Sequence, residues 1–225
     1  ELTSSDTEDI VDEVIDDLDE VDEVMPNAQD LALSVIIKNL NLDQAIETAH
    51  LPNISDALPQ LGMQLFYSKS LSGDLDTACV SCHHPSLGGA DNLSLSVGVA
   101  ATNPELLGLG RENNTAIPVV PRNAPTVFNL GLWDTGLFWD SRVESIGKES
   151  ATNGSVSGIR TPDSDFLVAD ITTGLNLSSA QASFPVTSGD EMKGNVFESD
   201  GDNESTRDHL AARIGDYGEG QGELD

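Results

Sequence analysis

The feature that most constrains this chain is the pentapeptide Cys79-Val-Ser-Cys-His, which contains its only two cysteines. Two thiols separated by two residues and followed directly by an imidazole form the C-x-x-C-H pattern of c-type haem attachment. In that arrangement both thiols form thioethers along one porphyrin edge, and the histidine becomes the proximal iron ligand. The pattern therefore predicts one covalently attached haem c, held by Cys79, Cys82 and His83.

Other uses of paired cysteines fit the surrounding sequence less well. A thioredoxin-type redox pair lies within an alternating α/β pattern, and a zinc site needs further Cys or His ligands at regular spacing. This chain shows no strand series, and its other histidines, His50, His84 and His209, are scattered. We expect His84, which directly follows the proposed ligand, to have a surface or packing role.

The apolar pattern of the rest of the chain predicts helices joined by long loops. Residues 6–25 carry apolar side chains at three- and four-residue steps beside a dense acidic face, which is typical of an amphipathic helix. A second helical segment is expected over 30–50, and another helix is expected from Ser205, which would cap it. The Gly-, Asn-, Ser- and Pro-rich stretches between them need an organiser such as a haem.

The predicted fold class is accordingly mostly α. We expect a cytochrome c-like haem domain with long loops and an extra acidic N-terminal helical segment. The low aromatic content, 4%, predicts a light core that a buried porphyrin would supplement.

The formal net charge of −29 excludes some classes of partner. Such a charge repels nucleic acid and anionic membrane surfaces, and no apolar run reaches the length of about 18 residues that a membrane span needs. The acidity suits a solvated surface or the docking of a basic redox protein. Because c-type haem is attached outside the cytosol in bacteria, we expect a periplasmic or extracellular protein whose signal peptide has been removed.

Three stretches in the chain, taken together, resemble a known family. "LGMQLFYSKSLSGDLDTACVSCHHPSLGGADN", "PRNAPTVFNLGLWDTGLFWDSRVESI" and "FPVTSGDEMKG" are similar to the N-terminal haem domain of bacterial di-haem cytochrome c peroxidases and their MauG-like relatives. The resemblance implies a haem c domain over 61–204, with an insertion at about 149–182. The acidic helical extension expected over 1–60 lies outside the resemblance. Residues 205–225 would form a C-terminal helix and linker toward a second haem domain.

The resemblance also implies roles for individual residues. Glu191 of "DEM" matches the acid on the peroxide side of the iron, and Trp139 of "LFWDSR" matches a tryptophan between the two haems. Arg122 of "PRNAP" matches an arginine near the haem propionates, and Asn123 matches an asparagine that contributes to a calcium site between the domains. The residues alone leave simpler roles open: a core aromatic for Trp139, a surface salt bridge for Arg122 and a loop asparagine for Asn123.

One position departs from the family pattern. Relatives end the loop after the "GG-DN" block in Gly-His, and that histidine can occupy the sixth position of the iron. Here Gly98 is followed by Val99, which cannot ligate iron, so we expect a five-coordinate or water-bound iron without reductive activation. A sixth ligand from elsewhere would favour electron transfer over peroxide chemistry. The candidates for such a ligand are Met63, Met192, His50 and His209.

The predicted function is that of a c-type haem oxidoreductase. We expect peroxidase-type reduction of hydrogen peroxide at an open iron, with electrons from a second haem or a small redox protein. The alternatives are a mono-haem electron-transfer module and a MauG-like enzyme that oxidises a protein substrate. Relatives carry a second C-x-x-C-H domain, so this chain is expected to be either a fragment of a di-haem protein or a mono-haem protein that recruits another haem chain.

Overall fold

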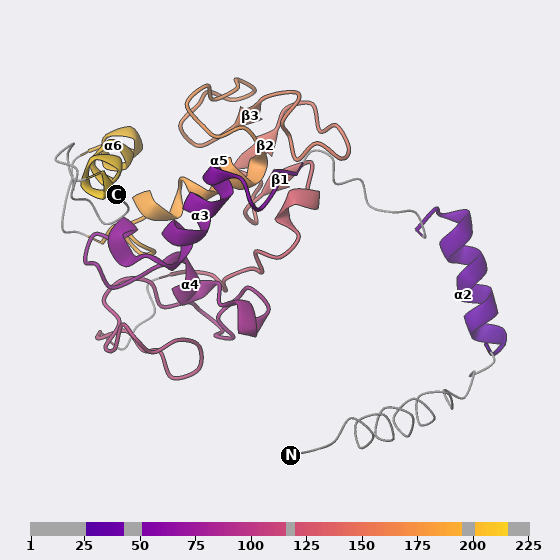
Figure 1. Ribbon diagram of the computed structural model, residues 1–225, viewed down its shortest axis with the longest axis horizontal. Helices are drawn as coiled ribbons and strands as arrows, with labels where there is room; N and C mark the ends of the chain where they lie inside the picture. The colour runs from indigo at the N-terminus through magenta and orange to yellow at the C-terminus, as the bar shows by residue number, and fades with distance from the viewer. Residues whose placement is uncertain (1–25, 43–50, 116–119, 195–200, 216–225) are drawn as a thin grey trace, which may run out of the picture. The chain divides into compact units, whose positions relative to one another are not determined.

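A computed structural model describes residues 26–42, 51–115, 120–194 and 201–215 (Figure 1). The chain divides into two compact units, Glu1–Ile46 and Glu47–Asp225. The acidic segment 6–25, expected to be helical, lies outside the described residues.

Helix α2 (Ala28–Asn39) is the described helix of the first unit. Its start is fixed by a reciprocal cap, because Asn27 Oδ1 accepts the backbone N–H groups of Gln29 and Asp30 at 2.8 and 3.1 Å. The Asp30 carboxylate in turn accepts the Asn27 N–H at 3.0 Å. The helix or helix pair expected over 30–50 therefore starts earlier, and its described helix ends at Asn39; residues 43–50 lie outside the described part of the chain.

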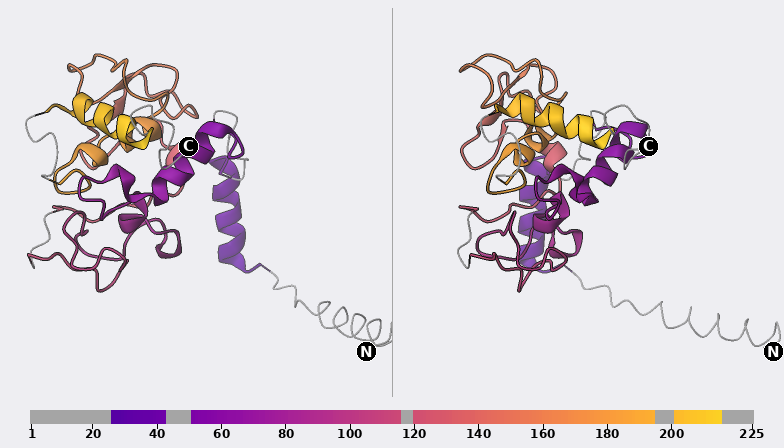
Figure 2. Two further views of the ribbon diagram at one scale, coloured as in Figure 1. Left: turned by 60° about the vertical axis from the view of Figure 1, so that its left-hand side comes forward. Right: turned by 90° about the vertical axis from the view of Figure 1, so that its left-hand side faces the viewer.

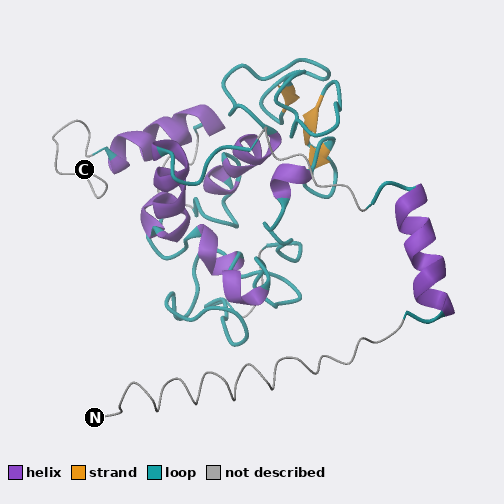
Figure 3. Cartoon of the chain, turned by 45° about the vertical axis from the view of Figure 1, so that its right-hand side comes forward, coloured by secondary structure: helices purple, strands orange, loops and turns teal. Residues whose placement is uncertain are grey.

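The second unit is built from short elements separated by long loops (Figure 3). In chain order its elements are α3 (Ala57–Tyr67), η1 (Lys69–Leu71), α4 (Cys79–Cys82), η2 (Pro85–Leu87), η3 (Leu130–Leu132), β1 (Gly136–Leu137), β2 (Val143–Ser145), β3 (Ile159–Arg160), α5 (Leu177–Ala182), η4 (Pro185–Thr187) and α6 (Asn203–Ile214). Helices outnumber strands and loops predominate in the described residues, which agrees with a cytochrome c-like chain. None of the described helices is both long and apolar enough to cross a lipid bilayer.

A small antiparallel sheet in the order β1-β2-β3 is present, although the sequence shows no strand series. Its register pairs Leu137 with Val143 and Ser145 with Ile159. Each strand is only two or three residues long, too short to produce a visible alternation of apolar and polar residues.

The main hydrophobic core lies beside this sheet, where α5 contacts β1 and β2. Residues 149–182, expected as a loop-rich insertion, contain β3 and α5 and contribute to this core, so the insertion is an integral part of the packed unit. The buried members of the core are Leu137, Val143, Ile159, Leu177, Ala180 and Phe184.

A second, smaller cluster joins α6 to the cysteine motif. Val186, Met192 and Leu210 are buried together, and Leu71 and Cys79 pack against them. Helix α6 lies alongside η4, as both views of Figure 2 show.

The start of α6 differs from the sequence prediction. Its cap is Asp202 and not Ser205, because the Asp202 carboxylate accepts the Ser205 N–H at 2.9 Å. Ser205 therefore lies inside the first turn.

Candidate functional site

The cysteine motif forms its own helical turn, α4. The His83 N–H donates to the Cys79 carbonyl at 3.0 Å, which closes the turn, and Ser81 Oγ accepts the Ala78 N–H at 3.1 Å at its start. Because both cysteines lie on one turn, their thiols can reach the same edge of one planar group. Both are free and half-buried.

The environment of the thiols argues against thiol redox exchange. Burial raises the pKa of Cys79 to about 11. Burial, with a smaller contribution from the Asp91 carboxylate, raises the pKa of Cys82 to about 12. Redox and metal-binding cysteines work as thiolates with lowered pKa values, and these two groups are shifted in the opposite direction.

The ring of His83 is oriented by two backbone carbonyls. Its Nδ1 lies 3.1 Å from the Pro125 oxygen and 3.2 Å from the Gly89 oxygen. Both neighbours are acceptors, so Nδ1 carries the proton and Nε2 keeps its lone pair. This tautomer is the one expected of a histidine that binds iron through Nε2, while the ligand role itself stays a prediction.

His84 has a local structural role. Its Nδ1 accepts the Ser86 N–H at 3.2 Å and caps the turn η2. The expectation of a surface or packing role agrees with this contact.

The surface next to α4 suits a large apolar group. Helix α3 is rich in apolar residues and contacts α4, yet none of its residues is buried. An apolar helix of a folded domain normally buries one face, so this surface fits a porphyrin. The exposed large side chains of α3 are Leu58, Leu61, Met63 and Tyr67.

A short segment, Val97–Ala100, links the cysteine motif to Glu191. The Val97 carbonyl oxygen lies 3.9 Å from Cys82 Sγ. A Cβ on Gly98 would overlap the Asp190 carbonyl oxygen and would lie 2.8 Å from Glu191 Cα, so only glycine fits. This close contact brings Glu191, more than a hundred positions further along the chain, beside the haem-attachment region.

Glu191 has the electrostatics of a proton-transfer group. Burial raises the pKa of its carboxyl; the nearby Arg142 opposes the shift and Asp190 adds to it. Its negative charge is also among the causes of the raised pKa of Cys82. A carboxyl whose pKa is shifted toward neutrality can both accept and donate a proton.

Trp139 and Arg122 lie together on the surface. The Arg122 guanidinium carbon is 3.8 Å from the centre of the Trp139 ring, a cation–π contact. Trp139 is 68% exposed, so the alternative of a core aromatic is wrong. The structure thus brings two of the predicted site residues into contact, although their roles stay predictions.

Asn123 is held by the loop after the cysteine motif, because its side-chain amide donates to the Leu93 carbonyl. Within the described ranges, no group of three or more His, Cys, Asp and Glu side chains is arranged to hold a metal ion. The calcium role of Asn123 therefore stays a prediction.

The structure places most of the residues considered for the sixth iron position. Val99 is buried beside Gly194. Met192 is buried in the small cluster with Leu210, and Met63 lies exposed on α3. His209 lies on α6, and His50 is outside the described residues.

Sequence reasoning missed two charged residues that hold this site together. Arg111 is 3% exposed and donates to the carbonyls of Val97 and Gly98. Asp76 accepts the Ala100 N–H at 2.7 Å. Both looked like ordinary loop charges in the sequence, where no motif singled them out.

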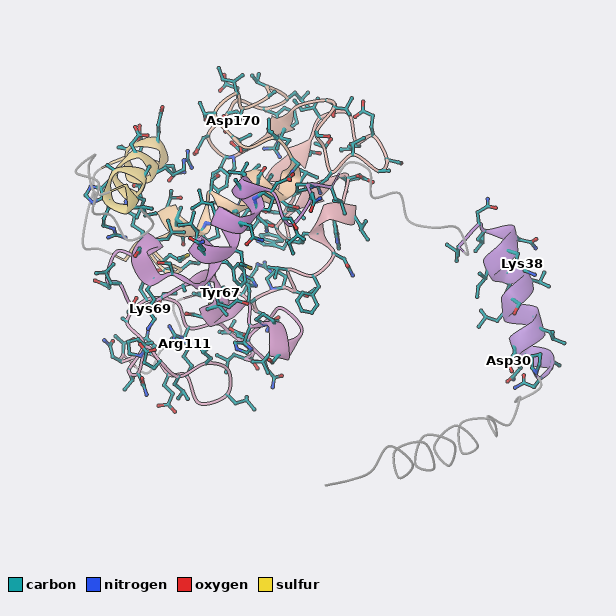
Figure 4. The ribbon with its side chains drawn as sticks, in the orientation of Figure 1. Asp30, Lys38, Tyr67, Lys69, Arg111 and Asp170 are labelled. Atoms are coloured by element: carbon teal, nitrogen blue, oxygen red, sulfur yellow. The ribbon has the colours of Figure 1, made fainter. Side chains whose placement is uncertain are left out.

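A surface hollow of about 410 Å³ lies between the 149–182 stretch and the start of α6. Asp170 lines it, and Figure 4 shows Asp170 and Arg111 at opposite ends of the unit. The lining residues Arg207 and Asp163 form an ion pair at 2.6 Å. This hollow is separate from the cysteine motif.

Known proteins match the part of the chain that contains these residues. The family model of the di-haem cytochrome c peroxidases matches residues 56–218. A cytochrome c551 peroxidase of Pseudomonas aeruginosa is 34% identical over 97 residues, covering 43% of this chain and 23% of the relative. The methylamine utilization protein MauG of Methylorubrum extorquens is 35% identical over 86 residues, covering 38% and 20%.

A cytochrome-c peroxidase of Denitromonas iodatirespirans is 36% identical over 100 residues, which cover 44% of this chain and 22% of the relative. The matched region thus spans less than a quarter of each of these relatives. The family match extends on both sides of the resemblance noted in the sequence and takes in α3 and α6. This chain belongs to the di-haem cytochrome c peroxidase family.

Proposed function

We propose that this chain is the peroxide-reducing haem domain of a c-type haem oxidoreductase. In the proposed reaction, hydrogen peroxide takes up two electrons and two protons and gives two molecules of water. The observation that supports it most is the close packing of Gly98 on the Glu191 backbone, which puts an acid of raised pKa beside the haem-attachment turn.

The residues around α4 fit one haem c. Cys79 and Cys82 would attach it, and His83, its Nδ1 proton directed to backbone carbonyls, would bind iron through Nε2. Arg122 would offer its planar fork to a propionate carboxylate. When bound, the haem would supply the redox chemistry, while the protein controls ligation, access and proton delivery.

Glu191 would act as the acid and base of the reaction. Its carboxylate would accept a proton from one peroxide oxygen and return it to the other, so that the departing oxygen leaves as water. Burial supports this role because the raised pKa makes the protonated and ionised forms closer in free energy at neutral pH. Arg142 limits the rise and keeps the ionised form accessible.

Trp139 would receive electrons from a second haem or a small redox protein. Its exposure and its stacking with Arg122 support a role at a surface that meets a donor. A basic donor would suit the net charge of −29. The same exposed tryptophan supports the alternative of MauG-like oxidation of a protein substrate through the surface.

Two further proposals rest on the resemblance to the family. Asn123 would contribute an oxygen ligand to calcium between this domain and a second haem domain. The protein would work in the periplasm or outside the cell, where c-type haem is attached.

Replacing Glu191 tests the function. We expect Glu191→Gln in the haem-loaded protein to lower the rate of peroxide reduction by an artificial electron donor by about 10²–10⁴-fold, because proton transfer by a positioned group is worth that much. The haem content, measured as the pyridine haemochrome, should stay unchanged. Glu204→Gln, at an exposed acid on α6, is the matched control and should leave the rate as it is. A wild-type rate in Glu191→Gln would contradict the proposal.

The absorption spectrum of the resting ferric protein separates the proposal from a mono-haem electron carrier. An open sixth position predicts a high-spin spectrum and rapid binding of cyanide. A low-spin spectrum would show a sixth ligand from the protein and would support electron transfer instead.

A further inference from the structure

We propose that Arg111 is a positioning residue for Glu191, acting through the backbone of Val97 and Gly98. This inference rests on the proposed function, because it takes Glu191 to be the acid–base group. Arg111 acts indirectly: it fixes the segment against which the Glu191 backbone packs.

All three nitrogens of the Arg111 guanidinium donate hydrogen bonds to backbone carbonyls. Nε donates to Val97 at 2.9 Å and Nη2 donates to Gly98 at 3.1 Å. On the opposite side, Nη1 donates to Pro104 at 3.2 Å and to Leu106 at 3.1 Å. With the side chain only 3% exposed, the planar fork connects two stretches of loop at fixed angles.

Two other side chains hold the same segment. Thr77 Oγ1 donates to the Gly98 carbonyl at 2.9 Å. The Asp76 carboxylate accepts the Ala100 N–H at 2.7 Å. The backbone is therefore anchored at Val97, at Gly98 and at Ala100, and Arg111 supplies two of these anchors.

The anchored segment packs directly against the Glu191 backbone and so determines where Glu191 lies. At Gly98 the backbone atoms of Asp190 and Glu191, including the Glu191 carbonyl oxygen, occupy the space where a Cβ would stand. A shift of Gly98 away from its carbonyl donors therefore moves Glu191. The Val97 carbonyl lies 3.9 Å from Cys82 Sγ, so Arg111 sets the spacing between the haem-attachment turn and the acid.

Arg111→Lys in the full, haem-loaded chain tests the proposal, because lysine keeps the charge and loses the planar fork. We expect kcat for peroxide to fall by about 10²-fold, the cost of misplacing a reacting group by about 1 Å, with the KM for the artificial donor unchanged. Hydrogen exchange of the Ala100 amide should become faster. Unchanged kcat or unchanged exchange would overturn the proposal.

Arg207→Lys is the matched control. Arg207 is also partly buried, pairs with Asp163 at 2.6 Å and donates to the Ser183 carbonyl, but it has no contact with residues 97–100 among those described. It should leave both kcat and the exchange of the Ala100 amide unchanged. A fall equal to that of Arg111→Lys would overturn the proposal by showing a general effect of losing an arginine.

The double variant separates this inference from the proposed function. If Arg111 acts through Glu191, Arg111→Lys should cause no further loss in a Glu191→Gln background, whereas independent effects would multiply. A multiplied loss would overturn the positioning role and leave the function standing. A wild-type rate in Glu191→Gln alone would overturn the function, and the faster exchange of Ala100 would still report on the segment.

Gly98→Ala provides a second variant should Arg111→Lys fail to accumulate. The new methyl group meets backbone that cannot rotate away, so Glu191 must shift, and we expect a fall in kcat similar to that of Arg111→Lys. A wild-type kcat in Gly98→Ala would overturn the proposal.

Discussion

Two regions of the second unit are stabilised in different ways. Around the sheet, apolar side chains of β1–β3 and α5 bury one another, and Val143, Leu177 and Ala180 are fully inaccessible. Around the cysteine motif, no apolar residue of α3 is buried, and the loops are held by buried polar groups such as Thr77 and Arg111.

This difference shows which region depends on a bound group. The sheet region completes its own hydrophobic core. The motif region fixes its backbone by hydrogen bonds and leaves an apolar surface exposed. If the proposed porphyrin covers that surface, the stability of this region should depend on haem attachment far more than that of the sheet region.

The strongest test of this comparison removes the attachment. We expect the double variant Cys79→Ala, Cys82→Ala to abolish the covalent attachment of haem, measured as the pyridine haemochrome after denaturation, because both thioethers are lost. Amides of residues 77–100 should lose protection from hydrogen exchange, while those of β2 and α5 keep it. Val80→Ala, on the same turn and without a polar side chain, is the control that retains the haem. Equal loss of protection in both regions would contradict the comparison.

A cavity in the sheet region should have the opposite effect. Leu177 is 0% exposed, and Leu177→Ala should lower the free energy of unfolding in urea by about 2–5 kcal/mol through lost burial and an empty cavity. Haem content should be retained. Leu175→Ala, at a side chain that is 83% exposed, is the control and should change stability little. Loss of haem in Leu177→Ala would show that the two regions are not separately stabilised.

The smallest expected effect concerns the pH dependence at Glu191. Because burial raises its pKa, the folded state binds this proton more tightly than the unfolded state. Its contribution to stability is therefore fully present below the ordinary pKa of a glutamate, about 4.3, and is lost as pH rises through the folded pKa. Proton acceptance from peroxide should increase over the same rise in pH.

Arg142→Gln sharpens this prediction. The cation at Arg142 lowers the pKa of Glu191, so its removal should move the midpoint of the pH–rate profile upward. Lys148→Gln, which removes a cation paired with Glu144 at 2.8 Å, should leave the midpoint in place. A downward shift in Arg142→Gln would contradict the electrostatics.

The features that could be predicted from the sequence are those that depend on short sequence motifs. The cysteine turn is predictable because attachment to one porphyrin fixes its spacing. The family resemblance is confirmed by the family match. The role of Glu191 followed from that resemblance and stays a prediction, although the structure does bring it beside Gly98.

The remaining features depend on contacts between distant residues. Strands of two or three residues carry no period, so the sheet and the role of 149–182 in its core were missed. The structural role of Arg111 could not be predicted from the sequence because its partners are backbone carbonyls, which every residue possesses. The cap at Asp202 was missed because Ser205, three residues later, is an equally good capping residue.

The exposed stack of Arg122 on Trp139 also gives the protein an optical reporter. Both tryptophans of the chain are more than half exposed, Trp133 at 55% and Trp139 at 68%. Intrinsic fluorescence from the haem-free chain should therefore have the long-wavelength emission of indoles in water. A protein that covers this face should move the emission to shorter wavelength, which makes docking measurable without any added label.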